Sequence, residues 1–190
     1  GALYRSIALN AINNGTNTDN EAEIDELLNN TKVEIKFING EQRVFLNSQD
    51  VSDKIRTTEV SMMASKVSAI AAVRDFLLEL QRGLARENNV IMDGRDIGTV
   101  VLPQAQVKIF LTASAQCRAK RRYKDYLAAG NTQESYEQIL ADIQQRDYND
   151  SHRAVAPLKP AEDSVVVDTS DDTLEQSVEK IIAVVNSKTK

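Results

Sequence analysis

Apolar residues recur at helical spacing in the first part of the chain. Leu3, Ile7 and Ala11 lie on one stripe, and this spacing predicts an amphipathic helix over residues 2–13. An Asn-Asn-Gly sequence follows the stripe and is typical of a helix end, because glycine adopts the left-handed backbone that closes a helix. A shorter stripe with an acidic first turn predicts a second helix over residues 19–28.

The hydrophobic period then changes from helical to alternating. Val33, Ile35 and Phe37 alternate with charged residues, and the alternation resumes beyond an Asn-Gly pair. Alternating segments joined by Asn-Gly predict an antiparallel hairpin over residues 32–47. We interpret residues 51–60 as a strand remnant or a loop. Because helical segments flank the hairpin, we interpret it as an insertion.

The remainder of the chain alternates between helical and strand-like segments. Helices are predicted over residues 58–87, 115–129, 133–147 and 173–187. Short apolar strands are predicted over residues 89–92, 107–111 and 164–167. Strands separated by helices favour an α/β fold with a parallel sheet, in which the functional site lies at the carboxyl ends of the strands.

Composition narrows the possible functions. The chain has 190 residues, of which 42% are hydrophobic and 27% charged, as expected for one globular domain with a small insertion. A single cysteine, Cys117, and a single histidine, His152, exclude a disulfide framework and leave almost nothing for a zinc site. The net charge of −5 argues against a general nucleic-acid binder. Apolar runs such as residues 69–73 are too short to span a bilayer.

These counts, together with the lack of a recognisable secretory leader, lead us to expect a cytosolic protein that works through Arg, Asp, Ser and backbone groups. The seven glycines exclude one motif as well. None of them is followed by lysine, so these residues contain no G-x-x-x-x-G-K-[ST] phosphate loop.

Two clusters of charged residues, at 93–99 and 118–124, are candidates for ligand binding. The first, residues 93–99, places two carboxylates and a guanidinium at the end of a predicted strand; a ligand site and a tight turn with internal ion pairs explain it equally well. The second is a run of five cations over residues 118–124. It is either a solvated helix face, the commoner case, or a clamp on a polyphosphate.

A third cluster covers residues 146–153. Arg146, Asp150 and Arg153 follow one another at spacings of four and three, so they share one helix face. Taken singly, ordinary helix ion pairs explain them better than a site does, and His152 is interpreted as their polar neighbour. Three further residues indicate nothing individually: Arg5, Ser65 and Arg74.

Taken together, these segments resemble the bacterial cytidylate kinases, a family of nucleoside monophosphate kinases. The resemblance rests on GALYR at 1–5, ASKVSAIAAVR at 64–74, DGRDIGTVV at 93–101, KIFLTAS at 108–114 and RDYNDSHR at 146–153. It covers nearly the whole chain in order, and the hairpin matches the enlarged nucleotide-binding insertion of the family. Many members carry a proline near Ala71, which this chain lacks, so we expect a softer bend between Ser65 and Arg74.

The resemblance implies a P-loop, NMP-kinase-like fold: a three-layer α/β structure with a parallel sheet and helices on both faces, plus a small inserted antiparallel β/α subdomain. We accordingly expect a core of residues 1–30 and 67–190, with a lid over about 115–155, and an inserted NMP-binding subdomain of residues 31–66.

In the family, a strand, the phosphate loop and a second strand precede the segment that matches Gly1. The first of these strands is the centre of the sheet, between the strands predicted at 89–92 and 107–111. We therefore expect these residues to belong to a longer protein and to lack kinase activity by themselves. Reading the coding region upstream of Gly1 would test this expectation.

The resemblance also implies roles for individual residues. Arg5, Arg95 and Arg153 match arginines on the monophosphate, where forked donors suit a dianion. Ser65, Arg74 and Asp96 match the residues that read cytosine, and Arg146 and Asp150 match those that hold the ribose hydroxyls. Arg118, Arg121 and Arg122 fall in the lid over ATP. The implied catalytic groups are Arg95, Arg121, Arg122 and Arg153.

The implied reaction is phosphoryl transfer from ATP to CMP or dCMP, giving CDP or dCDP, in cytoplasmic pyrimidine nucleotide metabolism. Mg²⁺ enters with ATP; no protein-bound metal, nucleic acid or membrane partner is expected, and we expect a monomer whose lid and insertion close on substrate. Two alternatives stay open. The first is a kinase of another monophosphate such as UMP, although the carboxylate of Asp96 would face a uracil carbonyl. The second is a non-catalytic CMP-binding fragment.

Overall fold

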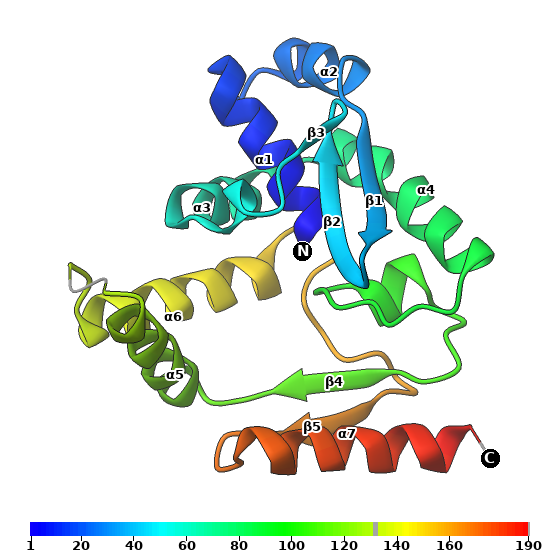
Figure 1. The fold of residues 1–190 in the computed structure, drawn as a ribbon, viewed down its shortest axis with the longest axis vertical. Helices are drawn as coiled ribbons and strands as arrows, with labels where there is room; N and C mark the ends of the chain where they lie inside the picture. Colours follow the sequence, from blue (N-terminus) through cyan, green and yellow to red (C-terminus); the bar gives the residue numbers. More distant parts are fainter. Residues whose placement is uncertain (131–132, 190) are drawn as a thin grey trace. The chain divides into compact units, whose positions relative to one another are not determined.

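The structure is a computed structural model that describes residues 1–130 and 133–189. It divides into two units, Gly1–Gly94 and Arg95–Lys190, and Figure 1 gives the order of their helices and strands. The lid expected over about 115–155 includes residues 131–132, which lie outside the described residues. Within the described ranges, no helix is both long enough and apolar enough to cross a membrane.

The first unit begins with two helices at the predicted places, α1 (Ala2–Asn14) and α2 (Glu21–Asn29). Helix α1 ends in a Schellman arrangement, in which the amide of Gly15 donates to the Ile12 carbonyl and the amide of Thr16 to the Ala11 carbonyl. Gly15 closes the helix with φ of 63°, a left-handed backbone that glycine adopts without a Cβ clash. The local stop signal therefore works as predicted.

The predicted hairpin is confirmed. Strands β1 (Val33–Ile38) and β2 (Glu41–Leu46) pair antiparallel, with Ile38 opposite Glu41, and a short strand β3 (Gln49–Asp50) pairs with β2. The two turn residues, Asn39 and Gly40, both have positive φ, 54° and 82°, which matches the right-handed twist of the strands. This three-stranded sheet, ordered β1-β2-β3, is separate from the parallel sheet of the second unit.

The segment after the hairpin, interpreted as a strand remnant or loop over 51–60, contains a 3₁₀ turn, η1 (Lys54–Arg56). The single helix predicted over 58–87 is wrong, because the structure has two helices there, α3 (Thr58–Val67) and α4 (Ala71–Glu87). Ile70 is extended between them, with φ of −82° and ψ of 122°. The expected softer bend is thus a full interruption, formed without proline.

The physical reason for the interruption is tertiary. Helix α3 packs against α1, whereas α4 packs against α2 as well as α1. Two segments with different partners need different directions, so the chain leaves the helix between them. Arg74 also satisfies a carbonyl exposed at the break, because its Nη1 donates to the Ser68 carbonyl at 3.0 Å.

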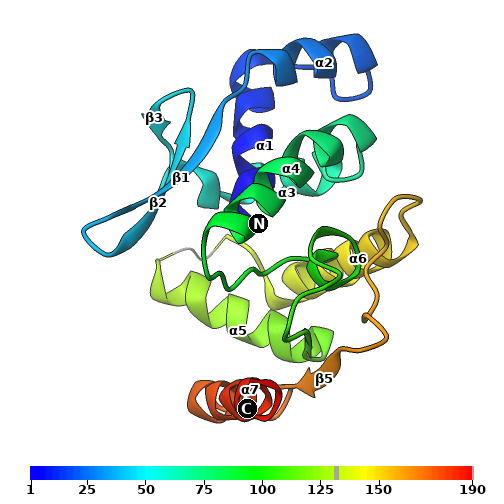
Figure 2. The same ribbon diagram turned by 90° about the vertical axis from the view of Figure 1, so that its right-hand side faces the viewer.

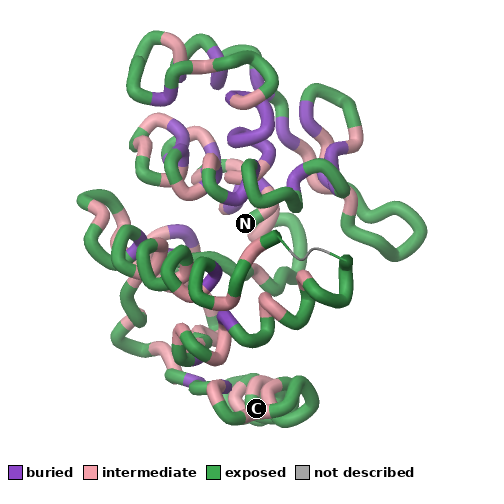
Figure 3. The backbone as a smooth tube through the Cα atoms, turned by 90° about the vertical axis from the view of Figure 1, so that its left-hand side faces the viewer, coloured by how far each residue is buried: buried purple, intermediate pink, exposed green. Residues whose placement is uncertain are grey.

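One hydrophobic core fills the first unit, and Figure 3 shows its buried positions along α1. Apolar residues of helices, strands and the η1 turn build it together, which fixes the register of the hairpin on the helices. The central buried residues are Leu3, Ile7, Ala8, Ile24, Leu28, Val33, Val44, Leu46, Ile55, Val60, Val67, Val73 and Leu77.

The second unit contains the parallel sheet. Strand β4 (Ile109–Thr112) pairs in parallel with β5 (Val165–Asp168), and this pairing confirms the α/β class. Helices α5 (Ala115–Ala128) and α6 (Tyr136–His152) pack against each other (Figure 2), and α7 (Leu174–Lys188) contacts β5. A π-helical turn, η2 (Ile97–Val101), precedes β4.

The strand predicted over residues 89–92 is wrong. These residues are irregular in the structure, and Ile91 is fully exposed. A strand is stabilised by ladder hydrogen bonds to a neighbour, and among the described residues β4 pairs only with β5. Among the described residues, no strand pairs with residues 89–92, so the segment has no ladder to join.

The expected division into a core, a lid and an inserted subdomain of residues 31–66 stays a prediction. It concerns parts that are expected to move with respect to one another when substrate binds. The boundary between the two units, at Gly94 and Arg95, follows the packing of this one structure and does not test that movement.

Candidate functional site

Two buried carboxylates stand at the centre of the charged residues in the second unit. Asp96 and Asp150 are each only 5% exposed. Asp96 begins the η2 turn, where its carbonyl accepts from the amides of Val100 and Val101 at 2.9 and 3.2 Å. Asp150 lies in the last turn of α6. Carboxylates are rarely buried without charged partners, and arginines supply them here.

Asp150 joins two motifs that the sequence presents separately. Its Oδ2 accepts from Arg95 Nε at 2.9 Å, and Arg146 Nε lies 3.9 Å from the same oxygen, one helical turn earlier. Arg95 is partly exposed, whereas Asp150 is buried. The predicted 93–99 and 146–153 clusters therefore form one cluster in the structure.

Arg153 lies directly after α6, at the point where the chain turns back. Its Nε donates to the Ala156 carbonyl at 2.7 Å, and its Nη2 lies 4.0 Å from Asp96 Oδ1. The amide of Leu158 donates to the Asp150 carbonyl at 2.8 Å, which folds this loop over the helix end. Five of the predicted site residues are thus brought together within the second unit: Arg95, Asp96, Arg146, Asp150 and Arg153.

In the first unit, Arg5 is held by two neighbouring elements. From the first turns of α1, its Nη1 donates to the Ile55 carbonyl of η1 at 3.1 Å, and its Nη2 donates to Ser61 Oγ of α3 at 3.2 Å. Neither partner was singled out from the sequence. The one available signal is that Ser61 and Ser65 lie four residues apart, so they share a face of α3.

Ser65 and Arg74 lie on either side of the break between α3 and α4. Arg74 is buried, its Nη1 donates to the Ser68 carbonyl, and its guanidinium carbon lies 5.9 Å from the centre of the Tyr4 ring. This contact is within the range of cation–π attraction. The Ser68 carbonyl at the break and the Tyr4 ring of α1 therefore both contact the Arg74 guanidinium.

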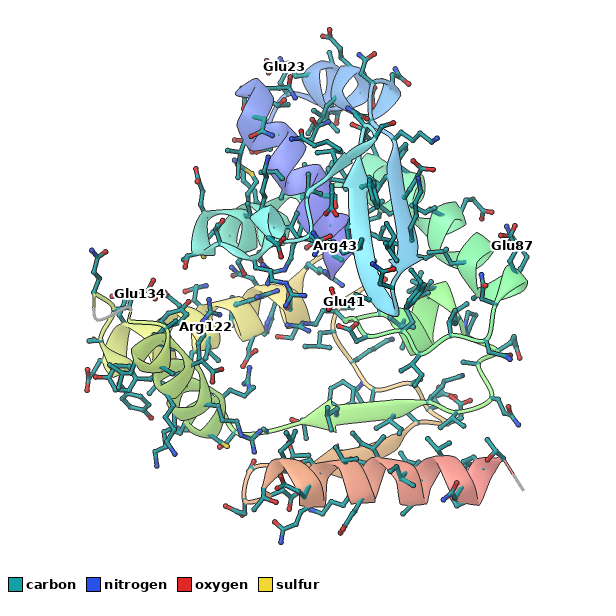
Figure 4. The ribbon with its side chains drawn as sticks, in the orientation of Figure 1. Glu23, Glu41, Arg43, Glu87, Arg122 and Glu134 are labelled. Atoms are coloured by element: carbon teal, nitrogen blue, oxygen red, sulfur yellow. The ribbon has the colours of Figure 1, made fainter. Side chains whose placement is uncertain are left out.

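The three arginines of α5 that were expected in the lid all have partners inside the second unit. Arg118 forms a bidentate pair with Asp147 of α6 and also donates to the Ala113 carbonyl at 3.0 Å. Arg121 Nη2 donates to the carbonyl of Thr169 at 2.6 Å, just after the carboxyl end of β5. Arg122, labelled in Figure 4, donates to Tyr126 Oη at 2.9 and 2.7 Å.

A purely solvated helix face does not describe this run of cations, since Arg118 holds α5 to α6 and Arg121 holds it to the end of β5. Lys120 and Lys124, by contrast, are exposed. Asp147 is a residue that the sequence analysis missed as a partner. Its only signal was its place beside Arg146 in the third cluster.

A hydrogen-bonded carboxylate, Asp168, ends strand β5. Asp168 accepts from the hydroxyl of Ser170 at 2.6 Å and from the amide of Ser170 at 2.8 Å, and these bonds hold the pKa of the Asp168 carboxyl below its usual value. The carboxylate is therefore ionised at neutral pH beside the loop that accepts from Arg121.

The single cysteine and the single histidine each contact a neighbouring residue of the protein. Cys117 lies at the start of α5 with its Sγ 3.0 Å from the Ser170 carbonyl oxygen. His152 stacks on Tyr148 with ring centres 4.1 Å apart. In the part of the chain that the structure describes, no three or more His, Cys, Asp or Glu side chains gather where they could hold a metal ion.

Comparison with known proteins identifies relatives of this chain. A family model described as cytidylate kinase matches residues 1–187. A relative named cytidylate kinase from Caldicellulosiruptor saccharolyticus is 47% identical over 182 residues, which cover 96% of this chain and 80% of the relative. Others of the same name come from Lactobacillus johnsonii, 45% identical over 190 residues (100% and 82% covered), and Pasteurella multocida, 44% over 183 residues (96% and 80%).

Proposed function

The chain belongs to the cytidylate kinase family, and on that premise we propose that it recognises CMP or dCMP and presents its phosphate to ATP. The reaction transfers the γ-phosphoryl group of ATP to the nucleotide and leaves ADP and CDP or dCDP. The observation that carries this proposal is the cluster in the second unit, in which two buried carboxylates alternate with three arginines. Such a cluster offers both acceptors and forked donors.

Base recognition is assigned to Asp96, with Arg74 and Ser65. A buried carboxylate accepts a hydrogen bond from the exocyclic amine of cytosine, whereas uracil places a carbonyl oxygen there. With uracil, the carboxylate oxygen and the carbonyl oxygen would both be acceptors, and both would stay buried without a hydrogen bond. Arginine and serine donors suit the cytosine carbonyl and ring nitrogen. The assignment favours CMP over UMP.

The monophosphate is assigned to Arg5, Arg95 and Arg153. A phosphate dianion suits planar guanidinium groups, which donate two parallel hydrogen bonds and stay charged at any working pH. In the structure these arginines already contact carbonyls or carboxylates, so their guanidinium groups are partly oriented before substrate arrives. Arg146 and Asp150 are assigned to the ribose hydroxyls.

The chain's part in the chemistry is positioning and charge neutralisation. Phosphoryl transfer asks little covalent work of a protein, because the attacking phosphate oxygen, the transferred group and the leaving group need only alignment and compensating charge. Arg95 and Arg153 would hold the attacking phosphate, while Arg121 and Arg122 neutralise charge on ATP as lid residues. Mg²⁺ enters as part of the co-substrate, bound to the phosphates of ATP.

Under the same proposal, the protein takes part in pyrimidine nucleotide metabolism in the cytoplasm. It acts as a monomer, and its substrates are ATP and CMP or dCMP. No nucleic acid or membrane enters the reaction. Closure of the lid would exclude the water that competes for the phosphoryl group.

Equilibrium titration of the chain with CMP, dCMP, UMP and cytidine tests the proposal. We expect CMP to bind about tenfold or more tightly than UMP, because only cytosine offers an amino group to Asp96. We expect a similar margin over cytidine, because cytidine lacks the phosphate. A protein that binds all four ligands equally would contradict the proposal. UMP binding as tightly as CMP would favour a kinase of another monophosphate. ADP formation from ATP and CMP, assayed with the expected phosphate-loop segment present, separates an enzyme from a binding fragment.

A further inference from the structure

Ser61 has a buried hydroxyl in the first turn of a helix. The residue is 7% exposed on α3 and lies between the buried apolar residues Val60 and Ala64. A hydroxyl in such surroundings destabilises the fold unless it is hydrogen-bonded. Alanine would fill a helical core position of this kind at lower cost, so the hydroxyl calls for an explanation.

The Ser61 hydroxyl accepts a hydrogen bond from Arg5. The Nη2 group of Arg5 lies 3.2 Å from Ser61 Oγ, while Nη1 donates to the Ile55 carbonyl at 3.1 Å. The two acceptors belong to different elements, η1 and α3, which both pack against α1. Because a guanidinium is planar and rigid, two acceptors on its two terminal nitrogens fix both its position and the orientation of its plane.

We propose that Ser61 is a positioning residue that orients the Arg5 guanidinium for the monophosphate of the substrate. The proposal rests on the proposed function, in which Arg5 binds that phosphate. Without the hydroxyl, Arg5 would lose one of these two hydrogen bonds, and the plane of its guanidinium would be held less firmly. The phosphate would then have to order the arginine as it binds, and this ordering costs side-chain entropy.

A purely structural role for Ser61 makes a different prediction. If the bond served only to join α1 to α3, its loss would lower the stability of the first unit and leave the preference for phosphorylated ligands unchanged. A matched control exists in Ser6, which is fully buried on α1 and donates to the Ala2 carbonyl of its own helix at 3.1 Å. Ser6→Ala removes the same group without touching the Arg5 pair.

The experiment is calorimetric titration with CMP and with cytidine, and a thermal unfolding curve for every variant. We expect Ser61→Ala to weaken CMP binding about three- to tenfold and to leave cytidine binding unchanged. Ser61→Thr, which keeps the hydroxyl, and Ser6→Ala should bind CMP as the parent chain does. In the Arg5→Ala background, Ser61→Ala should have no further effect, because its partner is already gone.

The outcomes separate the two proposals. If Arg5→Ala weakens CMP binding but Ser61→Ala does not, or weakens CMP and cytidine equally, the positioning role is wrong and the proposed function stands. If Arg5→Ala leaves CMP binding intact, the phosphate assignment of Arg5 fails, and the role of Ser61 fails with it. An additive effect of Ser61→Ala on top of Arg5→Ala would overturn the positioning role as well.

Discussion

At the scale of single residues, Asp96 is a carboxylate in a buried position. Nη2 of the Arg153 guanidinium lies 4.0 Å from its Oδ1. A carboxylate at this depth needs compensating donors. The proposed function assigns one of those donors to the amino group of cytosine, so the identity of the base should depend on this side chain.

Asp96→Asn should reduce discrimination between CMP and UMP. An amide can turn either its oxygen or its nitrogen toward the base, whereas a carboxylate only accepts. Losing a charge-assisted hydrogen bond should weaken CMP binding by about 1.5–3 kcal/mol, or roughly one to two decades in Kd, and should weaken UMP binding much less. The measurement is the ratio of the two dissociation constants.

Arg153→Ala serves as the comparison for this prediction. The phosphate assigned to Arg153 is common to both nucleotides, so this variant should weaken CMP and UMP by similar factors. Equal weakening of both ligands by Asp96→Asn would instead mean that Asp96 orients Arg153 and does not read the base.

At the scale of elements, two glycines in helices have opposite roles. Gly15 ends α1 with φ of 63° and has no atom within 4 Å of the place where a Cβ would sit. Gly83 lies inside α4, where an added Cβ would meet only Arg86 Nη2 at an ordinary 3.8 Å. Space is sufficient at both positions, and only the backbone conformation distinguishes them.

Gly15→Ala should therefore lower the free energy of unfolding by about 1 kcal/mol, because alanine is strained in the left-handed region. Gly15→Asn should cost less, since asparagine tolerates that region better. Gly83→Ala should raise the free energy of unfolding by about 0.5–1 kcal/mol, because alanine favours a helix interior. Denaturant unfolding measures all three, and the same sign for both alanine variants would refute the argument.

The three-stranded sheet of the first unit contains an ion-pair network with a defined pH range. Arg43 of β2, labelled in Figure 4, donates to Asp50 at 2.8 Å and to Asp53 at 3.1 Å. The hydrogen bond from Arg43, helped by the hydroxyl and amide of Ser52, lowers the pKa of Asp50 from 3.8 to about 2. This pairing ties the end of β3 to the middle of the sheet.

Because the folded pKa is lower than the unfolded one, ionised Asp50 stabilises the fold at pH values above the unfolded pKa. That contribution should disappear as the pH falls from about 4 toward about 2. We expect Asp50→Asn to lower Tm at neutral pH, and the gap to the parent chain to close over that range. Asp25→Asn, on the exposed surface of α2, is the control. A gap that persists unchanged at about pH 2 would count against the ion pair.

At the scale of the whole molecule, the two units bury different amounts of apolar surface. The first unit holds a continuous core built from helices, strands and a 3₁₀ turn. In the second unit, the buried apolar residues among those described are Val101, Ala113, Ala119, Ile139 and Val167. Helix α7 contributes none, and its apolar residues Leu174, Val178 and Ile182 are exposed.

Amide hydrogen exchange should reflect this difference. Local opening is easiest where few apolar contacts are lost, so amides of α1 and α4 should be protected more strongly than those of α7 and β5. Exchange read by mass spectrometry on peptides from each element is the measurement. Equal protection across both units would show that buried apolar area does not set the order of opening.

Local patterns determined several features of this protein. The stripe of α1 and its Asn-Asn-Gly end, and the hairpin around Asn39 and Gly40, were predicted from the sequence and are present. Each depends on residues close together in the chain, where spacing and backbone preference decide the conformation. The charged motifs and their resemblance to cytidylate kinases likewise came from short segments, and the family comparison confirms the resemblance.

Tertiary structure decided the features that depend on distant partners. The helical pattern runs unbroken from Thr58 to Glu87, yet α3 and α4 separate, because α3 packs against α1 and α4 packs against α2 as well. The apolar pattern of residues 89–92 predicts a strand, but the structure has none there, because a strand needs a neighbouring strand for its backbone hydrogen bonds. The sequence also did not indicate the partners of the predicted site residues, such as Ser61 for Arg5 and Asp147 for Arg118. A sequence specifies which donors a chain possesses, whereas packing alone determines which acceptors they meet.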